Sequence, residues 1–292
     1  MTDVTTYRAA PPVAPLYART VLGSLPRLGG RRARRDSLPD VEVRRLGVRT
    51  DPDHLASYAR LTGHRLRDRL PGLYPHLAAF APQLALITDR RFGFAAMGLV
   101  HVQHALVQHR PLSIGETYDL AVRPAGLRPH RSGRLVDLHT DVCVHGETVW
   151  EETMTLLARG NGDADATDAS PLAAADAPTG ETRWQVPADI GRAFAGVSGD
   201  RNPIHLSRLT ARVFGFPRAI AHGMWTAARA LAAVESTLPA AYRYDVAFRK
   251  PVLLPAEVRF GTVAAPVGCL LLGVVSADRR HQHLVGRVGS PA

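Results

Sequence analysis

The residues best suited to chemistry lie in one short segment, 198–207, which reads Ser-Gly-Asp-Arg-Asn-Pro-Ile-His-Leu-Ser. Asp200, Asn202 and His205 share a turn that glycine and proline punctuate, and an apolar stretch follows it. A carboxylate and an imidazole held on a rigid loop can share one water molecule. Such a pair can move a proton and an oxygen atom within the same active site.

A helix downstream of this segment is expected to help position it. From Ala219 to about Thr237 the chain is rich in good helix formers, and its apolar positions are nearly continuous. A helix that is apolar on most of its faces must be buried. A buried helix followed by several antiparallel strands predicts a sheet wrapped around it.

The chain consists of two similar halves. Tyr-Ala-Arg-Leu-Thr-Gly at 58–63 matches Phe-Ala-Gly-Val-Ser-Gly at 194–199, and Arg-Pro-Leu-Ser-Ile-Gly-Glu at 110–116 matches Lys-Pro-Val-Leu-Leu-Pro-Ala at 250–256. Between the halves, residues 159–181 have the Ala, Asp, Ser, Thr and Pro content of a linker. A duplicated unit is the simplest explanation.

Both halves continue in strand-like segments rich in Val, Leu and Thr. The predicted strands lie at 117–122, 135–144 and 148–157 in the first half, and at 258–263, 269–275 and 283–288 in the second. In the first half, the helical stretch at 73–88 contains Pro75 and Pro82. Because proline removes a hydrogen bond and clashes with the preceding turn, we expect a shorter, bent or displaced helix, and a pocket in the vacated space.

The duplication also isolates the chemistry in the second half. At the positions matching the Asp, Asn and His of the segment, the first half has His64, Leu66 and Arg69. One site per chain is therefore expected.

The net charge of the chain limits the classes of partner that it can be expected to bind. The net charge is +10, mostly from scattered arginines, and the one dense cluster is at 31–35. No aromatic residues interleave with that cluster to stack bases, so nucleic acid is disfavoured as a partner. A basic surface also suits a phosphate-rich ligand such as coenzyme A, or an acidic carrier protein.

The apolar segments and the number of cysteines indicate the cellular compartment in which the protein is expected. No apolar run is long enough to cross a membrane, and the patch at 13–25 is a poor secretory signal. A cytoplasmic protein is expected. Cys143 and Cys269 are the only cysteines, so they are interpreted as ordinary strand residues without a disulfide framework.

Two histidine pairs have spacings that could coordinate zinc, His101-x-x-His104 and His281-x-His283. The sequence offers neither pair a third or fourth ligand. Sheet or pocket lining is the favoured interpretation, and no metal is expected.

Residues 194–205, Phe-Ala-Gly-Val-Ser-Gly-Asp-Arg-Asn-Pro-Ile-His, resemble the hydratase-2 motif of the MaoC-like dehydratase family. Ala-His-Gly-Met at 221–224 and Phe-Arg-Lys-Pro-Val-Leu-Leu-Pro at 248–255 are similar to the next two landmarks of that family. The good match covers about residues 182–265. The first half resembles the degenerate repeat of two-domain members, the actinobacterial 3-hydroxyacyl-thioester dehydratases.

The resemblance implies an α+β double hot-dog fold, in which each half wraps an antiparallel sheet around a helix. It divides the chain into an N-terminal arm (1–40), a degenerate non-catalytic hot-dog (41–158), the linker, and a catalytic MaoC-like hot-dog (182–292). The implied activity is reversible hydration of trans-2-enoyl thioesters to (3R)-3-hydroxyacyl thioesters in fatty acid metabolism, without metal or redox cofactor.

The resemblance also implies roles for individual residues. The catalytic Asp and His of the family correspond to Asp200 and His205. Its oxyanion donor, a backbone amide at the start of the hot-dog helix, corresponds to Gly223. The first amides of a helix have no internal partner and lie at the positive end of its dipole, so this one can donate to an enolate oxygen.

Four neighbouring residues are expected to bind substrate or shape the loop. Asn202 either shapes the turn or contacts the water. Ser198 is interpreted as a turn or cap residue, because no Gly-x-Ser-x-Gly elbow surrounds it. His222 is expected to orient the backbone rather than transfer protons, and Met224 completes the group.

Two alternative functions stay open on the same fold: an acyl-thioesterase and a non-catalytic acyl-thioester-binding protein. The expected partner is an acyl-CoA or acyl-carrier-protein thioester, and a homodimer is compatible with the sequence. The proline-interrupted helix favours a roomy channel for medium or long acyl chains.

Overall fold

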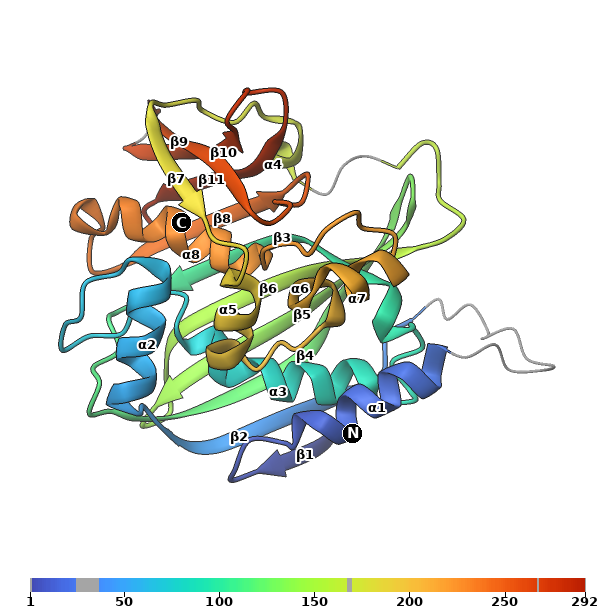
Figure 1. The fold of residues 1–292 in the computed structure, drawn as a ribbon. Helices are drawn as coiled ribbons and strands as arrows, with labels where there is room; N and C mark the ends of the chain where they lie inside the picture. Colours follow the sequence, from blue (N-terminus) through green and yellow to red (C-terminus); the bar gives the residue numbers. More distant parts are fainter. Residues whose placement is uncertain (1, 25–36, 167–169, 267, 292) are drawn as a thin grey trace.

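The structure is a computed structural model that describes residues 2–24, 37–166, 170–266 and 268–291. The arginine cluster at 31–35 lies outside the described residues. In the described part, one large sheet carries helices that pack on it in both halves of the chain (Figure 1).

The sheet has eleven strands among the described residues, in the order β1-β2-β4-β5-β6-β3-β8-β11-β10-β9-β7. All neighbours are antiparallel except β1 and β2, which are parallel. The strands are β1 (Asp3–Tyr7), β2 (Val41–Arg49), β3 (Leu99–Gln108), β4 (Thr117–His130), β5 (Gly133–Val144), β6 (Glu147–Arg159), β7 (Thr182–Val186), β8 (Tyr242–Phe248), β9 (Ala256–Ala265), β10 (Cys269–Ser276) and β11 (Gln282–Gly289).

The strand order repeats itself about the centre of the sheet. Reading outward from the centre, the first half has β3-β6-β5-β4-β2 and the second has β8-β11-β10-β9-β7. The halves join where β3 pairs with β8, from Gln103 opposite Ala247 to Gln108 opposite Tyr242. The six strands predicted from composition lie in β4, β5, β6, β9, β10 and β11, and the duplication is confirmed.

The helices complete each half. They are α1 (Val13–Ser24), α2 (Pro52–Thr62), α3 (Pro75–Thr88), α4 (Pro171–Ala174), α5 (Ile190–Ser198), α6 (Pro203–Leu206), α7 (Arg208–Val213) and α8 (Gly223–Ala233), with 3-10 turns η1 (Ala96–Gly98) and η2 (Glu235–Thr237). α3 packs on β2, β4 and β5, and α8 packs on β10 and β11. In each half, part of the common sheet packs around one long helix, which is the arrangement expected of a double hot-dog fold.

The matched strings at 58–63 and 194–199 lie at equivalent places in the two halves. Gly63 caps the C-terminus of α2 and Gly199 caps that of α5, and both glycines adopt the left-handed conformation, with φ of 81° and 75°. Glycine adopts such a φ without the steric cost that a Cβ brings, so the same residue ends the same helix in each half.

The predicted buried helix is present but shorter than expected. α8 begins at Gly223, four residues later than predicted, because Ala219–Ala221 are extended and bond to the segment at 252–254. Ile220 forms a bridge with Leu253, the Ala221 amide donates to the Val252 carbonyl, and the Leu254 amide donates to the Ala219 carbonyl.

The expectation of a shorter helix in the first half is wrong. α3 spans 14 residues, whereas α8 spans 11. Pro75 occupies the first turn, where a missing amide proton costs nothing. Pro82 leaves the Ala78 carbonyl without its helical donor, and the Arg45 guanidinium donates to that carbonyl instead, at 3.2 Å.

Cys143 lies in β5 and Cys269 in β10, as expected for ordinary strand cysteines. Among the described helices, none has the length and apolarity needed to span a bilayer.

His64 stands in the first half where Asp200 stands in the second, directly after the helix-ending glycine. Its side chain is buried, its Nδ1 lies 2.8 Å from the Thr62 hydroxyl, and its ring stacks on Tyr58. Burial, and then the positive charge of Arg229, lower the pKa of His64 to about 4.

This burial predicts acid sensitivity. The folded pKa of His64 lies below the unfolded value, so its contribution to stability is present above about pH 6.5 and is lost as the pH falls. Between pH 7 and pH 5 the loss is about 2 kcal/mol of unfolding free energy for this one group. His64→Gln is expected to reduce the loss by that amount in urea titrations at the two pH values. An equal loss in both proteins would contradict the assignment.

Candidate active site

The loop after α5 is held by its own polar side chains. Gly199 turns the chain, and the Ser198 hydroxyl accepts a hydrogen bond from the Asp200 amide at 3.2 Å. The Asn202 side-chain oxygen accepts from the Ile204 amide at 3.4 Å and caps α6, which carries His205. Ser198 and Asn202 therefore bond to the backbone of the loop, which limits the freedom of Asp200 and His205.

The two carboxylate oxygens of Asp200 have different surroundings. Oδ1 accepts the Tyr17 hydroxyl at 2.7 Å and the Asn202 amide at 3.1 Å. Oδ2 lies 3.8 Å from His222 Nε2, beyond hydrogen-bonding distance. The side chain is 28% exposed. Oδ1 is thus engaged by the protein, and Oδ2 is the oxygen left to accept from a water molecule.

The ring of His205 is oriented by a hydrogen bond that it donates, whereas Asp200 is held by bonds that it accepts. The His205 ring is buried, and its Nδ1 lies 2.9 Å from the Ile220 carbonyl. Because a carbonyl only accepts, Nδ1 carries the proton and Nε2 carries the lone pair. The same reasoning applies to His222, whose Nε2 donates to the Asp200 carbonyl at 3.0 Å. The two rings stack with centroids 3.6 Å apart.

The three side chains converge. Ligating atoms of Asp200, His205 and His222 all lie within 4.8 Å of one another. A water molecule that makes two hydrogen bonds of about 2.8 Å can bridge groups at this separation. The arrangement can therefore hold a water between a carboxylate and an imidazole.

The environment sets the charge of these groups. Burial lowers the pKa of His205, and the Asp200 charge only partly opposes it. Burial and then His205 lower the pKa of His222 to about 4. Burial acts to raise the pKa of Asp200, but His222, His205 and the Tyr17 hydroxyl outweigh it and lower the value. At neutral pH the carboxyl group of Asp200 is therefore ionised, and the imidazoles of His205 and His222 are neutral.

Gly223 begins α8 directly after His222, which is the N-cap residue. As the first residue of the helix, Gly223 has no carbonyl one turn earlier to accept from its amide. A Cβ here would lie 3.1 Å from the Phe248 ring, so glycine keeps the space beside the helix terminus open. Met224 follows with its side chain buried.

Tyr17 is the site residue that sequence reasoning missed. It comes from α1 in the N-terminal arm, 183 residues from Asp200, and α1 packs on α3 and η1. Burial, and then the Asp200 charge, raise the pKa of the Tyr17 hydroxyl, which keeps it a donor. No motif or spacing in the sequence marks this tyrosine, because only the packing of α1 brings it to the loop.

Of the two histidine pairs singled out by spacing, only His104 belongs to a group of described residues that could hold a metal ion. His101 contacts Phe248, with ring centroids 4.9 Å apart, and its pKa is lowered to about 3, first by burial. His283 bonds the Lys250 carbonyl from the surface. The expectation that His104 has no further ligand nearby is wrong, because the fold brings two distant residues, His76 and Glu152, beside it.

Three groups in the described part of the chain have side chains that could hold a metal ion. They are the buried His76, His104 and Glu152, the site residues Asp200, His205 and His222, and the partly exposed His139, Asp141 and Glu151.

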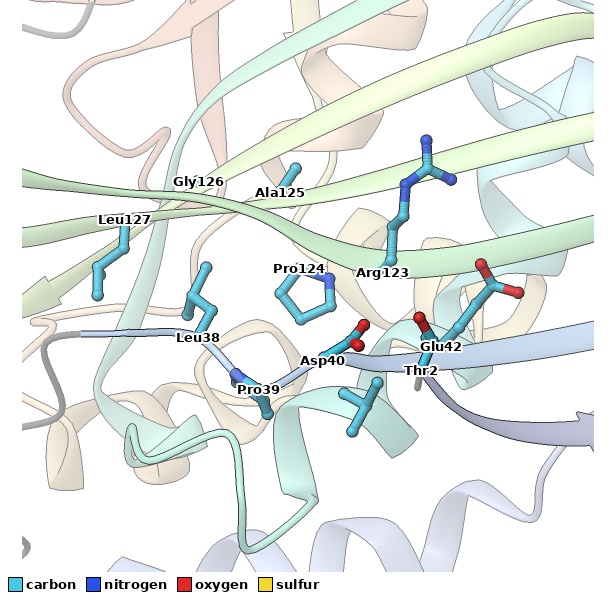
Figure 2. A pocket seen from close by; sticks show the side chains of 11 residues that line it. Thr2, Leu38, Pro39, Asp40, Glu42, Arg123, Pro124, Ala125, Gly126 and Leu127 are labelled. Atoms are coloured by element: carbon cyan, nitrogen blue, oxygen red, sulfur yellow. The ribbon is translucent and has the colours of Figure 1, made fainter.

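A hollow of about 370 Å³ lies elsewhere, over the start of β2 and the middle of β4 (Figure 2). Asp40 and Glu42 line one side of it, and Arg123 lines the other. None of the residues predicted to do chemistry lines it.

The chain is a double hot-dog protein in which Asp200 and His205 lie beside His222, the N-cap residue of α8. The MaoC like domain matches residues 165–266. The 3-hydroxyacyl-thioester dehydratase X of Mycobacterium tuberculosis is 39% identical over 240 residues, which are 82% of this chain and 84% of that protein. The chain therefore belongs to the MaoC-like dehydratase family.

Solved structures agree. The crystal structure of HtdX from M. tuberculosis matches with a TM-score of 0.75 and 35% identity over 86% of this chain and all of that chain. A MaoC-like dehydratase from Phytophthora capsici matches with a TM-score of 0.70 over 87% of this chain and 96% of that chain, at 17% identity, and supports the fold alone. A double hot-dog protein of M. tuberculosis matches with a TM-score of 0.54 and 16% identity over 83% of this chain and 92% of that chain.

The loop depends on a close contact from α5. A Cβ on Gly191 would lie 2.1 Å from the His205 carbonyl oxygen, whereas a Cβ on Gly196 in the same helix would meet nothing within 4 Å. Gly191→Ala must displace the loop and is expected to cost about 1–3 kcal/mol of unfolding free energy. Gly196→Ala is expected to add up to about 1 kcal/mol, because alanine is the better helix former. Urea unfolding of the two variants measures both effects, and equal stabilities would refute the contact.

Proposed function

We propose that this chain catalyses the reversible hydration of trans-2-enoyl thioesters to (3R)-3-hydroxyacyl thioesters, as a 3-hydroxyacyl-thioester dehydratase of fatty acid metabolism. Its relationship to a protein of that name over most of its length supports the activity. The observation that carries the proposal is a pair of acceptor atoms. The described residues bond to Asp200 Oδ1 and His205 Nδ1, and none of them donates a hydrogen bond to Asp200 Oδ2 or His205 Nε2.

The hydration step follows from these two acceptors. A water held by Asp200 Oδ2 and His205 Nε2 gives up one proton as its oxygen bonds to C3 of the enoyl group. The π electrons move toward the thioester carbonyl, and C2 then takes a proton from the same pair. The water adds one hydrogen and one hydroxyl group, so nothing else is consumed. Dehydration is the same path in reverse.

The negative charge that develops on the thioester oxygen needs a donor. We assign this role to the Gly223 amide, at the positive end of α8. A preorganised donor of this kind contributes about 10²–10³ in rate. His222 holds the Asp200 backbone through its Nε2, and its buried Nδ1 makes no hydrogen bond to a described residue. We assign it a positioning role.

Tyr17 is assigned a positioning role as well. Its hydroxyl occupies Asp200 Oδ1, which directs the water to Oδ2 and lowers the pKa of the carboxyl group. The N-terminal arm (1–40) thereby completes a site that otherwise belongs to the second half. On this proposal residues 182–292 form the catalytic hot-dog, 159–181 the linker, and 41–158 the non-catalytic hot-dog.

The substrate is proposed to be a coenzyme A or acyl-carrier-protein thioester in the cytoplasm. The basic surface suits the phosphates of either carrier. The argument for a wide acyl channel weakens, because α3 is a full-length helix with its Pro82 position repaired by Arg45.

The pair itself gives the first test. Asp200→Asn and His205→Gln are each expected to reduce hydration of crotonyl-CoA by about 10²–10⁴, because each removes a group that handles the proton. Loss of enoyl absorbance measures the rate, chiral analysis of the product identifies the (3R) alcohol, and circular dichroism checks the fold. Full activity in both variants would refute the proposal. Release of free thiol from saturated acyl-CoA, without enoyl hydration, would assign the site to a thioesterase.

Tyr17→Phe gives a second test. Losing the hydroxyl raises the pKa of Asp200, so the acid side of the kcat/KM profile is expected to move to higher pH. We expect kcat to fall by about tenfold, the effect of one lost hydrogen bond to a charged group. Tyr7→Phe, in β1 of the same arm, serves as the control. A Tyr17→Phe profile identical to that of the parent enzyme would remove Tyr17 from the site.

A further inference from the structure

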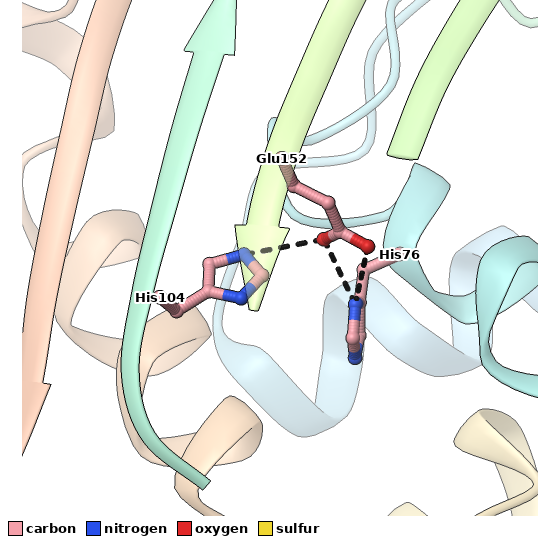
Figure 3. Close-up of side chains that lie close together, drawn as sticks. All are labelled: His76, His104 and Glu152. Carbon is pink, nitrogen blue, oxygen red and sulfur yellow. Dashed lines mark hydrogen bonds and ion pairs between the residues drawn. The ribbon is translucent and has the colours of Figure 1, made fainter. Parts of the chain in front are cut away.

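A second cluster of titratable side chains lies buried in the first half (Figure 3). His76 comes from α3, His104 from β3 and Glu152 from β6. His76 is 6% exposed, and the other two are 1% exposed. His76 Nδ1 lies 3.0 and 2.9 Å from the two carboxylate oxygens, and His104 Nε2 lies 3.2 Å from Oε2. Two imidazoles and one carboxylate thus face a common point.

The polar atoms of this cluster are not all satisfied within the described protein. Neither ring nitrogen of His104 has a hydrogen-bond partner among the described residues, since the 3.2 Å approach to Glu152 lacks the geometry of a hydrogen bond. The Gln83 side-chain oxygen is also buried, and no described residue donates to it. Buried polar groups without partners destabilise the folded state, so such groups call for an explanation. A bound ion would give them one.

We propose that His76, His104 and Glu152 bind one divalent transition-metal ion of the zinc type. Two histidines and one carboxylate are a ligand set that Zn²⁺ uses in proteins. In a tetrahedral site with metal–ligand distances near 2.0 Å, ligand atoms lie about 3.3 Å apart. The nitrogen–oxygen distances of 2.9 and 3.2 Å are close to that value.

The surroundings suit a metal. Both ring nitrogens of His104 are buried without a hydrogen bond to a described residue, so a nitrogen lone pair is available to an ion. Gln83 donates to Glu152 Oε1 at 2.5 Å and so orients the carboxylate, as residues behind metal ligands do. A fourth position would be left for a water molecule.

The ion would join a helix to the sheet. Its ligands come from α3 and from two neighbouring strands, so binding would tie the central helix of the first half to β3 and β6. His101 contacts His104 on one side and Phe248, which borders Gly223, on the other. Because the three ligands tie a helix to two strands of the first half, the role inferred is structural, and it does not depend on the proposed hydration.

The test uses the full chain produced in medium supplemented with Co²⁺ or Zn²⁺. We expect about one ion per chain by elemental mass spectrometry and, for Co²⁺, the visible absorption of a tetrahedral site with nitrogen and oxygen ligands. Zn²⁺ is expected to raise the midpoint of thermal unfolding. His104→Gln and Glu152→Gln are expected to lose the ion and the rise in midpoint.

Two matched variants separate this cluster from the others. His205→Gln removes a ligand from the active-site group, and His139→Gln removes one from the surface group, so both are expected to keep the ion. Retention of the ion in His104→Gln, or its loss in His205→Gln alone, would overturn the proposal. If neither cluster variant folds, the parent chain decides: refolded from urea with Co²⁺ present, it must bind the ion, and failure to do so also overturns the proposal.

Discussion

The pairing of β3 with β8 is the constraint on which the rest of the structure depends. It joins two half-sheets into one sheet. The helices of the two halves then contact each other, α2 with α5 and α2 with α8. The Trp225 ring donates to the Leu61 carbonyl at 2.8 Å, and His54 Nε2 bonds the Val197 carbonyl at 2.8 Å. Each contact joins the end of α2 or α5 to the opposite half. The loop that carries Asp200 therefore starts from a helix anchored on both sides.

In the site, two atoms of the same side chain have different tasks: one is bonded to the protein, and the other faces the site. Asp200 presents one oxygen to the protein and the other to the site, and His205 does the same with its two nitrogens. This division matters because a catalytic group must be held rigidly and still have an unused lone pair. Burial keeps the imidazoles neutral, and the donors around Asp200 keep its carboxyl group ionised.

Duplication let the two halves diverge in what they bury. In the first half, His64 stands at the position of Asp200 and packs on Tyr58 as a neutral ring. Beneath α3 the same half gathers His76, His104 and Glu152, whereas α8 in the second half buries Met, Trp, Thr, Ala and Leu. The second half carries the loop with Asp200 and His205, and the first carries a buried polar cluster. A common scaffold tolerates both, because Asp200 and His205 lie in the loop after α5 and in α6, whereas the cluster lies on α3, β3 and β6.

Local pattern alone determined much of this protein. Strand composition located six strands, the matched strings of the two halves indicated the duplication, and the segment around Asp200 and His205 identified the family. These features are encoded by neighbours in sequence, through backbone preferences and short turns. The length of α3 was misjudged because the donor that compensates Pro82 is the side chain of Arg45 on β2.

Only the tertiary structure decided which distant residues meet. Tyr17 reaches Asp200 across 183 residues, and Glu152 reaches His76 across 76. Neither contact leaves a periodicity or a spacing in the chain, since both result from packing between separate elements. A sequence records which groups can react, but the pairing of strands and the seating of helices determine which of them share a site.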